Sequence, residues 1–180
     1  MKTRVIIVDD HPIVRRGMYE LLNQEEEFIV CGLAEDISSE EKRIEETQPE
    51  LAIIDITLAG DNGLELVKEL TSKKHPLLIL VLSMHDEQVW AQRAIRAGAR
   101  GYIMKKEASE NVISALRNIR SGKIHVSSKI MDRLLDRLQV NVDTAAGRTV
   151  ELLTDREIEV FRLLGAGYST REIAEQMKLG

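Results

Sequence analysis

Apolar residues in the first 122 positions follow two alternating patterns. Five short, largely apolar runs, rich in β-branched residues, predict buried β-strands: Val5–Val8, Phe28–Leu33, Leu51–Ile56, Leu77–Leu82 and Arg100–Met104. After four of these runs, apolar residues recur three or four positions apart, which predicts amphipathic helices. After the second run, Ser38 with Glu41 has the spacing of a capping box and predicts a polar, weakly amphipathic helix. These expected helices span residues 13–22, 38–47, 64–70, 89–97 and 112–119.

This alternation of strand and helix indicates an α/β fold. The strands show continuous rather than alternating hydrophobicity, which is typical of parallel strands that are buried on both faces. Helical crossovers between parallel strands are right-handed and place helices on both sides of the sheet. We therefore expect a five-stranded parallel sheet in a doubly wound, flavodoxin-like arrangement over residues 1–122, in which ligands bind beyond the carboxyl ends of the strands.

The remaining third of the chain has a different pattern. Residues 123–150 contain one predicted helix, Lys129–Leu138, and then a polar stretch, Asn141–Thr149, that is typical of a linker. Residues 151–180 predict two further helices, because Thr154 with Glu157 and Ser169 with Glu172 have the spacing of capping boxes. We expect a small, partial all-α domain there.

Charge and hydropathy exclude some classes of protein. The net charge of the 180 residues is −5, so bulk electrostatics does not favour a polyanion as partner. Asp9 interrupts the first apolar run after four residues, which is too short for a signal peptide. Since no run approaches the ~18 apolar residues of a membrane span, we expect a cytoplasmic protein with no membrane contact.

The polar residues that interrupt or follow the strands carry the candidate chemistry. Strand one ends at Asp9-Asp10, strand three near Asp55, strand four at Ser83 and strand five at Lys105. In a parallel sheet these ends lie at one edge, and converging carboxylates raise one another's pKa unless a cation joins them. Carboxylate oxygens suit Mg²⁺. A divalent ion, an ammonium and a hydroxyl together can bind a phosphoryl group that a carboxylate attacks.

Each of these residues also has an ordinary explanation when taken alone. Asp9-Asp10 could be a turn and a helix cap, Ser83 a cap, and Lys105 a solvated lysine like its neighbour Lys106. Tyr102 could be a half-buried strand residue. The joint pattern, in which the polar groups come in chain order and each lies at a strand end, favours the functional interpretation.

Four segments resemble the receiver domain of two-component response regulators: Val5–Pro12, Leu51–Ile56, Val81–His85 and Gly101–Lys106. Asp10-His11-Pro12, Ser83-Met84-His85 and Gly101-Tyr102 are similar to the NarL/LuxR-type subclass. The segments Leu153–Val160 and Glu172–Glu175 resemble its LuxR-type helix-turn-helix domain. The resemblance covers nearly the whole chain outside the linker. It divides the chain into a receiver domain (1–122), a linker (123–150) and the first part of a DNA-binding domain (151–180).

The resemblance implies roles for the residues at the strand ends. Asp55 would accept a phosphoryl group from a sensor histidine kinase. Asp10, Asp55 and the main-chain carbonyl of Thr57 would bind Mg²⁺, and Asp9 would assist through water. Such a protein is a phosphoacceptor that catalyses only its own phosphotransfer and dephosphorylation, and is not otherwise an enzyme.

The resemblance also implies a switch and an output. Ser83 would move toward the phosphate, Tyr102 would rotate inward behind it, and Lys105 would pair with it. The added charge of about −1.5 to −2 would bias the surface formed by the fourth helix, fifth strand and fifth helix. We expect phosphorylation to favour a homodimer, and the full-length protein to bind promoter DNA.

The chain departs from the family pattern at two places. Ala59-Gly60 stands where the loop after Asp55 usually carries a proline, which favours a more flexible loop. The helix-turn-helix pattern ends at Gly180, before the recognition helix that enters the major groove. Residues 151–180 hold four basic and six acidic residues, so no DNA-binding residue is assigned here.

Three alternatives stay open from the sequence. Residues 151–180 could be a helical interaction segment, or the chain could be a stand-alone receiver that acts by binding a protein. A haloacid-dehalogenase-type phosphatase also uses a strand-end aspartate with Mg²⁺, a hydroxyl and a lysine. That class needs a second aspartate two residues after the nucleophile, where this chain has Thr57, and an acidic pair late in the chain, whereas Asp9-Asp10 comes first.

Overall fold

The computed structural model describes residues 2–36, 44, 46–58, 61–72, 77–139 and 154–177. Five parallel strands form one sheet in the order β2-β1-β3-β6-β7. Their bounds are β1 Thr3–Val8, β2 Phe28–Ala34, β3 Leu51–Asp55, β6 Leu78–Ser83 and β7 Gly101–Met104. The predicted α/β fold with a doubly wound parallel sheet is therefore confirmed, with strand ends shifted by one or two residues in places.

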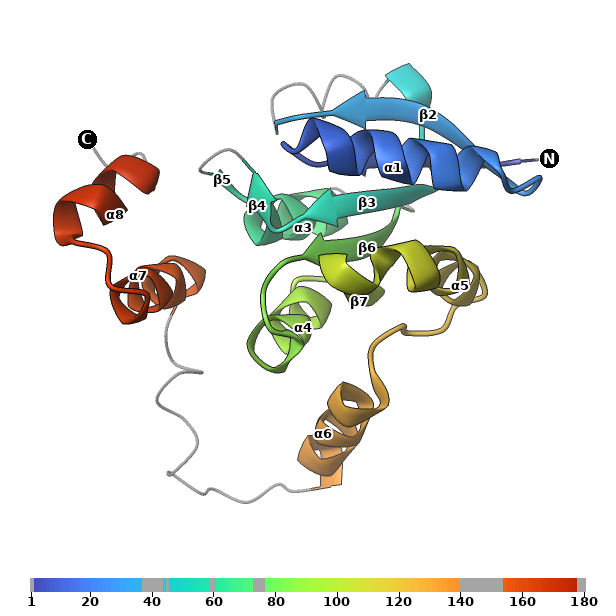
Figure 1. Ribbon diagram of the computed structural model, residues 1–180. Helices are drawn as coiled ribbons and strands as arrows, with labels where there is room; N and C mark the ends of the chain where they lie inside the picture. The colour runs from blue at the N-terminus through green and yellow to red at the C-terminus, as the bar shows by residue number, and fades with distance from the viewer. Residues whose placement is uncertain are drawn as a thin grey trace.

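Helices cover both faces of this sheet, as Figure 1 shows. Their bounds are α1 Pro12–Asn23, α3 Gly63–Ser72, α4 Glu87–Arg96 and α5 Ala108–Arg120. Helices α1 and α5 lie on one face, and α3 and α4 lie on the other. Of the helix predicted over 38–47, Ile44, Glu46 and Thr47 are helical, while its other positions lie outside the described residues.

The apolar core is divided between the two faces by the alternation of side chains along each strand. In β3, Leu51 and Ile53 pack in the cluster under α1 and α5, whereas Ala52 and Ile54 pack in the cluster under α3 and α4. All five residues of β3 are buried. Burial on both faces explains why this strand reads as a continuous apolar run.

The segment after β3 forms a small hairpin where the sequence predicted only a loop. Two-residue strands β4 (Thr57–Leu58) and β5 (Asp61–Asn62) pair antiparallel. The hairpin brings Gly63 back against the end of β3, where its N–H donates to the carbonyl of Ile56 at 2.8 Å. A Cβ at Gly63 would lie 2.1 Å from the carbonyl oxygen of Asp55, so only glycine fits this approach.

The chain after α5 returns to the open edge of the sheet. His125 forms a parallel bridge with Gly101, and its carbonyl accepts from the N–H of Tyr102 at 2.9 Å. Helix α6 (Ser128–Gln139) follows, and its Ile130 is buried in the cluster that also holds Trp90 of α4. The stretch predicted as a linker thus begins with a segment packed on the receiver, and Asn141–Thr149 lies outside the described residues.

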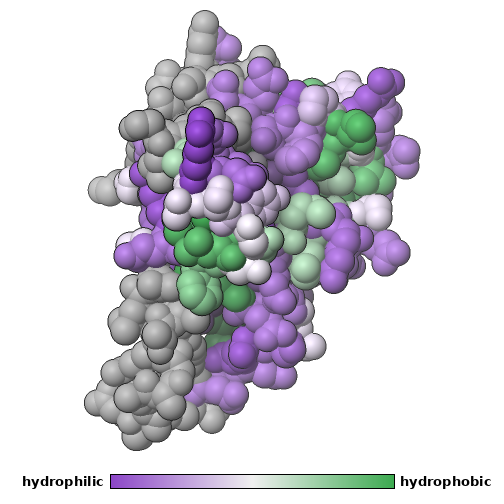
Figure 2. Space-filling model, turned by 60° about the vertical axis from the view of Figure 1, so that its left-hand side comes forward, coloured by the Kyte–Doolittle hydropathy of each residue, from purple (hydrophilic) through white to green (hydrophobic). Residues whose placement is uncertain are grey.

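Two further helices lie near the carboxyl end, α7 (Asp155–Gly165) and α8 (Thr170–Gln176). Both predicted capping boxes are present, at Thr154 with Glu157 and at Ser169 with Glu172. Figure 2 brings this side of the molecule forward and shows apolar side chains gathered on a largely polar surface. The exposed large apolar residues of α7 and the turn after it are Phe161, Leu164 and Tyr168.

None of the helices in the described part of the chain has both the length and the apolar character that a membrane span requires.

The approach of Gly63 to β3 predicts a strong effect of one methyl group. Gly63→Ala should lower the free energy of unfolding by about 1–3 kcal/mol, because the new Cβ has to displace the backbone of β3. Gly17→Ala is the matched control, since a Cβ at Gly17 in α1 would meet nothing within 4 Å. It should stabilise the protein by about 0.5–1 kcal/mol. Urea unfolding measures both, and equal stability of Gly63→Ala and wild type would contradict the close approach.

Candidate functional site

The carboxyl ends of four neighbouring strands bring the sequence-predicted polar residues to one edge of the sheet. Asp9 and Asp10 follow β1, Asp55 ends β3, Ser83 ends β6 and Lys105 follows β7. These strands are adjacent in the order β1-β3-β6-β7. Asp9, Asp55 and Ser83 are buried, with 1%, 2% and 0% of their surface exposed. The polar groups therefore meet in a crevice at the end of an apolar sheet.

Lys105 joins two of the carboxylates. Its Nζ lies 2.8 Å from Oδ2 of Asp9 and 2.8 Å from Oδ2 of Asp55, and its side chain is 6% exposed. Burial alone would lower the pKa of Lys105, but the hydrogen bonds to Asp55 and Asp9 outweigh it and raise the pKa. The lysine is therefore held as a cation. Lys106 has a 66% exposed side chain and pairs with Glu107 at 3.8 Å, outside the crevice.

The ionised form of Asp55 remains unfavourable even with Lys105 beside it. Burial raises the pKa of its carboxyl to about 6, against the contrary effect of Lys105, and the nearby charge of Asp9 adds to the rise. The N–H of Thr57 donates to Oδ1 of Asp55 at 3.2 Å. Lys105 thus pairs with Asp9 and Asp55, and Asp10 lies in the same cluster. Converging carboxylates of this kind favour a bound cation.

The donor set fits a divalent metal ion. Ligand atoms of Asp9, Asp10, His11 and Asp55 all lie within 4.8 Å of one another. Three of the four are carboxylates, the hard oxygen ligands that Mg²⁺ prefers. Thr57 lies two residues after Asp55 at the start of β4, so its main chain borders the same crevice.

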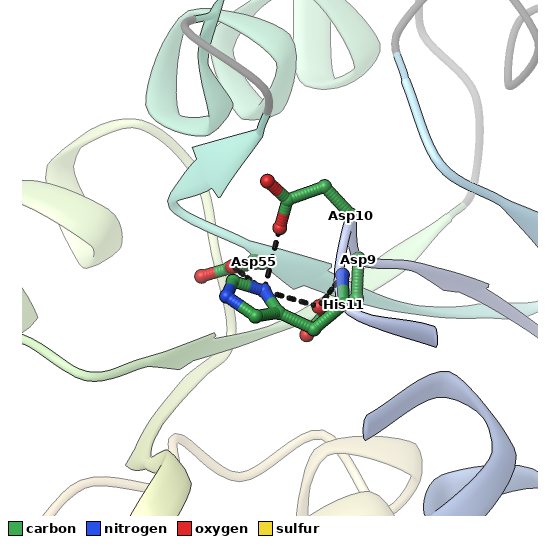
Figure 3. A group of neighbouring side chains, drawn as sticks. All are labelled: Asp9, Asp10, His11 and Asp55. Carbon is green, nitrogen blue, oxygen red and sulfur yellow. Dashed lines mark hydrogen bonds and ion pairs between the residues drawn. The ribbon is translucent and has the colours of Figure 1, made fainter. Parts of the chain in front are cut away.

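His11, which was not predicted as a site residue from the sequence, places its imidazole among the three carboxylates (Figure 3). Its Nδ1 is 2.6 Å from Oδ1 of Asp10, 3.1 Å from Oδ1 of Asp9 and 3.9 Å from Oδ2 of Asp55. Its position directly after Asp9-Asp10 was a usable signal, because a residue at the same strand end reaches the same crevice.

The hydroxyls of Ser83 and Tyr102 both engage the main chain of His85. Oγ of Ser83 accepts from the N–H of His85 at 3.0 Å, and the hydroxyl of Tyr102 donates to the carbonyl of His85 at 2.8 Å. Tyr102 is 3% exposed, so it is buried rather than half-buried. Burial raises the pKa of Tyr102, and the phenol stays protonated.

His85 itself is a second residue whose place in the site was not predicted from the sequence. Its Nε2 lies 3.1 Å from Oγ1 of Thr57, and its ring stacks on Trp90 with centroids 5.0 Å apart. Burial lowers the pKa of His85. Through main chain and ring, His85 therefore contacts Ser83, Tyr102 and Thr57 at once.

Helix α7 lies against the receiver beside this residue. Asp155 accepts from Nζ of Lys68 at 3.0 Å and from Nη1 of Arg93 at 2.8 Å, which ties the first turn of α7 to α3 and α4. Ile158 is buried in the receiver's α3/α4 core cluster, and Oε2 of Glu159 is 4.0 Å from Nε2 of His85. A cavity of about 290 Å³ lies between the two parts. Its lining includes Thr57, His85, Trp90, Glu159, Leu163 and Met177.

Comparison with known proteins identifies the class. Residues 5–117 match the response regulator receiver domain, and residues 151–180 match the bacterial regulatory proteins of the luxR family. The chain belongs to the response regulators of the NarL/LuxR type, which are two-component transcription regulators.

Curated relatives match along almost the whole chain. The oxygen regulatory protein NreC of Staphylococcus carnosus (strain TM300) is 30% identical over 178 residues, which cover 97% of this chain and 82% of the relative. The transcriptional regulatory protein DegU of Brevibacillus brevis is 29% identical over 189 residues, covering 98% and 80%. The regulator class therefore rests on both parts of the chain rather than on the receiver alone.

Solved structures give the same picture. A LuxR-family two-component response regulator from Aurantimonas sp. SI85-9A1 has a TM-score of 0.69 at 28% identity and covers 78% of this chain and 100% of its own. RcsB from Salmonella enterica serovar Typhimurium, bound to promoter rprA in the presence of phosphomimetic BeF3-, has a TM-score of 0.68 at 26% identity. That match covers 100% of this chain and 85% of RcsB. These findings favour the regulator over the phosphatase and the stand-alone receiver.

The raised pKa of Asp55 predicts how the metal-free protein responds to pH. A carboxyl whose folded pKa is about 6 and whose unfolded value is 3.8 destabilises the fold fully above pH ~6. That penalty disappears as the pH falls toward the unfolded value. Asp55→Asn removes the charge, so in EDTA it should raise the free energy of unfolding at pH 8 by about 1–3 kcal/mol. The gain should shrink toward pH 4.

Urea unfolding at several pH values checks this, with the exposed Asp132→Asn as the matched control. The control should show no pH-dependent gain. Lower stability of Asp55→Asn than of wild type at pH 8 would contradict the account of Asp55 as a strained charge.

Proposed function

We propose that Asp55 is the phosphoacceptor of this response regulator, with Mg²⁺ as its cofactor. Support comes from the 2.8 Å contact between Nζ of Lys105 and Oδ2 of Asp55 at a crevice that also holds Asp9 and Asp10. The functional units are the receiver (1–122), the linker (123–150) and the first part of the helix-turn-helix domain (151–180). A sensor histidine kinase is the phosphoryl donor, and the protein works in the cytoplasm.

The transfer step uses the carboxylate of Asp55 as the nucleophile. One carboxylate oxygen attacks the phosphorus of the kinase's phosphohistidine, the P–N bond breaks, and its electron pair leaves with the imidazole. Lys105 holds Asp55 in place before the transfer and neutralises a phosphoryl oxygen during it. The protein contributes this catalysis to its own phosphorylation. Water later attacks the phosphorus, the bond to the Asp55 oxygen breaks, and inorganic phosphate leaves the regenerated carboxylate.

Asp9, Asp10, Asp55 and the main-chain carbonyl of Thr57 are the residues that would hold the metal, with Asp9 acting through water. Bound Mg²⁺ supplies positive charge that stabilises the phosphoryl oxygens in the transition state. The pairing of Asp9 with Lys105 at 2.8 Å supports an indirect role for Asp9, because that carboxylate already has a cationic partner.

Ser83 and Tyr102 then report the phosphate to the rest of the molecule. When Oγ of Ser83 turns toward a phosphoryl oxygen, it releases the N–H of His85 that it now accepts from. His85 carries the hydrogen bond from Tyr102 and faces Glu159 of α7. The change at Asp55 thereby reaches both the α4-β7-α5 surface and the contact with the output helices.

The output is promoter binding by the full-length protein. Phosphorylation favours a homodimer, because a two-fold symmetric pair matches the paired half-sites that helix-turn-helix dimers bind. The match of residues 151–180 to the luxR family supports DNA as the target.

Labelling with acetyl phosphate tests the proposal. Wild type with Mg²⁺ should gain one phosphoryl group, detected by intact-protein mass spectrometry, and a chelator should prevent it because the metal is then removed. Asp55→Ala should gain none, while the matched control Asp132→Asn should be labelled like wild type. Labelling of Asp55→Ala to the wild-type extent would refute Asp55 as the acceptor.

A further inference from the structure

The imidazole of His11 contacts the carboxylate oxygens that a metal ion would bind. Its Nδ1 lies 2.6 Å from Oδ1 of Asp10 and 3.1 Å from Oδ1 of Asp9, and Figure 3 shows the ring between the carboxylates. Nζ of Lys105 lies 3.3 Å from the same Nδ1. The imidazole therefore fills the gap that remains after Lys105 has paired with Asp9 and Asp55.

The hydrogen bond to Asp9 indicates the role of Nδ1. A carboxylate oxygen can only accept, so Nδ1–H of His11 donates to Oδ1 of Asp9 at 3.1 Å. A nitrogen that binds a metal has to offer a lone pair instead. In this arrangement His11 is a competitor of the metal ion and not a ligand to it.

The ring can leave without disturbing the fold. Its side chain is 56% exposed, so one side faces solvent. The backbone is held independently, because the main-chain N–H of His11 donates to Oδ1 of Asp9 at 2.8 Å and Pro12 begins α1. Mg²⁺ keeps several of its waters when it binds, and these waters need the space over the carboxylates that the ring covers.

We propose that His11 is a gate on the metal site, whose imidazole holds the carboxylates in the metal-free protein and swings out toward solvent when Mg²⁺ binds. This inference rests on the proposed Mg²⁺-dependent phosphorylation of Asp55. The gate raises the Mg²⁺ concentration at which the site fills, and it limits the repulsion between Asp9 and Asp10 when the site is empty.

Calorimetric titration of the full chain with MgCl₂, after dialysis against EDTA and then buffer at pH 8, tests the gate. His11→Ala should lower the dissociation constant roughly tenfold, the scale of one charge-assisted contact that the ion no longer displaces. Ile13→Ala is the matched control, because Ile13 is 87% exposed near the same end of α1. Its dissociation constant should equal that of wild type.

The direction of the change separates the outcomes. Weaker binding by His11→Ala would overturn the gate and make His11 a ligand, and equal binding would overturn it as well. The double variant His11→Ala/Asp10→Asn should show no heat of Mg²⁺ binding, and this loss would assign the binding heat to this site. No heat from wild type or His11→Ala would contradict the proposed metal site itself, a failure distinct from that of the gate alone.

Discussion

The ammonium of Lys105 between the carboxylates of Asp9 and Asp55 is the interaction on which the site depends. The sheet buries both carboxylates almost completely, and burial of an unpaired charge costs several kcal/mol. Lys105 offsets part of this cost with two contacts of 2.8 Å. Burial still raises the pKa of Asp55 to about 6, and Asp10 and His11 lie in the same cluster of possible metal ligands.

The connection from this site to the output helices runs through a short stretch of chain. His85 lies two residues after Ser83, and its main chain is bound by Ser83 and Tyr102. Its ring stacks on Trp90 and lies close to Glu159. The ion pairs of Asp155 with Lys68 and Arg93 also hold α7 against the receiver. A small displacement of His85 would therefore act on the packed interface between α7 and the receiver. Packed interfaces of this kind convert small shifts into discrete changes.

Much of the fold could be predicted because a strand that is buried on both faces has a continuous run of apolar residues. The runs at β1, β3 and β6 are continuous and apolar, so the first polar residue at or beyond each run marks a strand end. Asp9, Asp55 and Ser83 were predictable for that reason, and Lys105 was predictable because it follows the shorter run at β7. The hairpin after β3 was not, because Thr57–Leu58 and Asp61–Asn62 are too short to show a period and depend on the close approach of Gly63.

The two histidines escaped prediction for a different reason. A histidine gives no periodic signal, and its role depends on which atoms surround it in three dimensions. His11 differs from a solvated turn residue because its Nδ1 lies 3.1 Å from Oδ1 of Asp9 and 2.6 Å from Oδ1 of Asp10. His85 differs only because the strand end at Ser83 turns its ring toward Thr57 and Trp90.

The pKa of Asp55 in the metal-free protein tests the central claim most directly. A carboxyl-carbon NMR titration, first in EDTA and then in MgCl₂, follows this residue alone when Asp55→Asn is used to assign its signal. The account predicts a pKa of about 6 without metal and a clear fall when Mg²⁺ is added. A value at or below the usual 3.8 in EDTA, unchanged by Mg²⁺, would contradict the claim that burial disfavours the ionised Asp55 and that a metal ion relieves this cost.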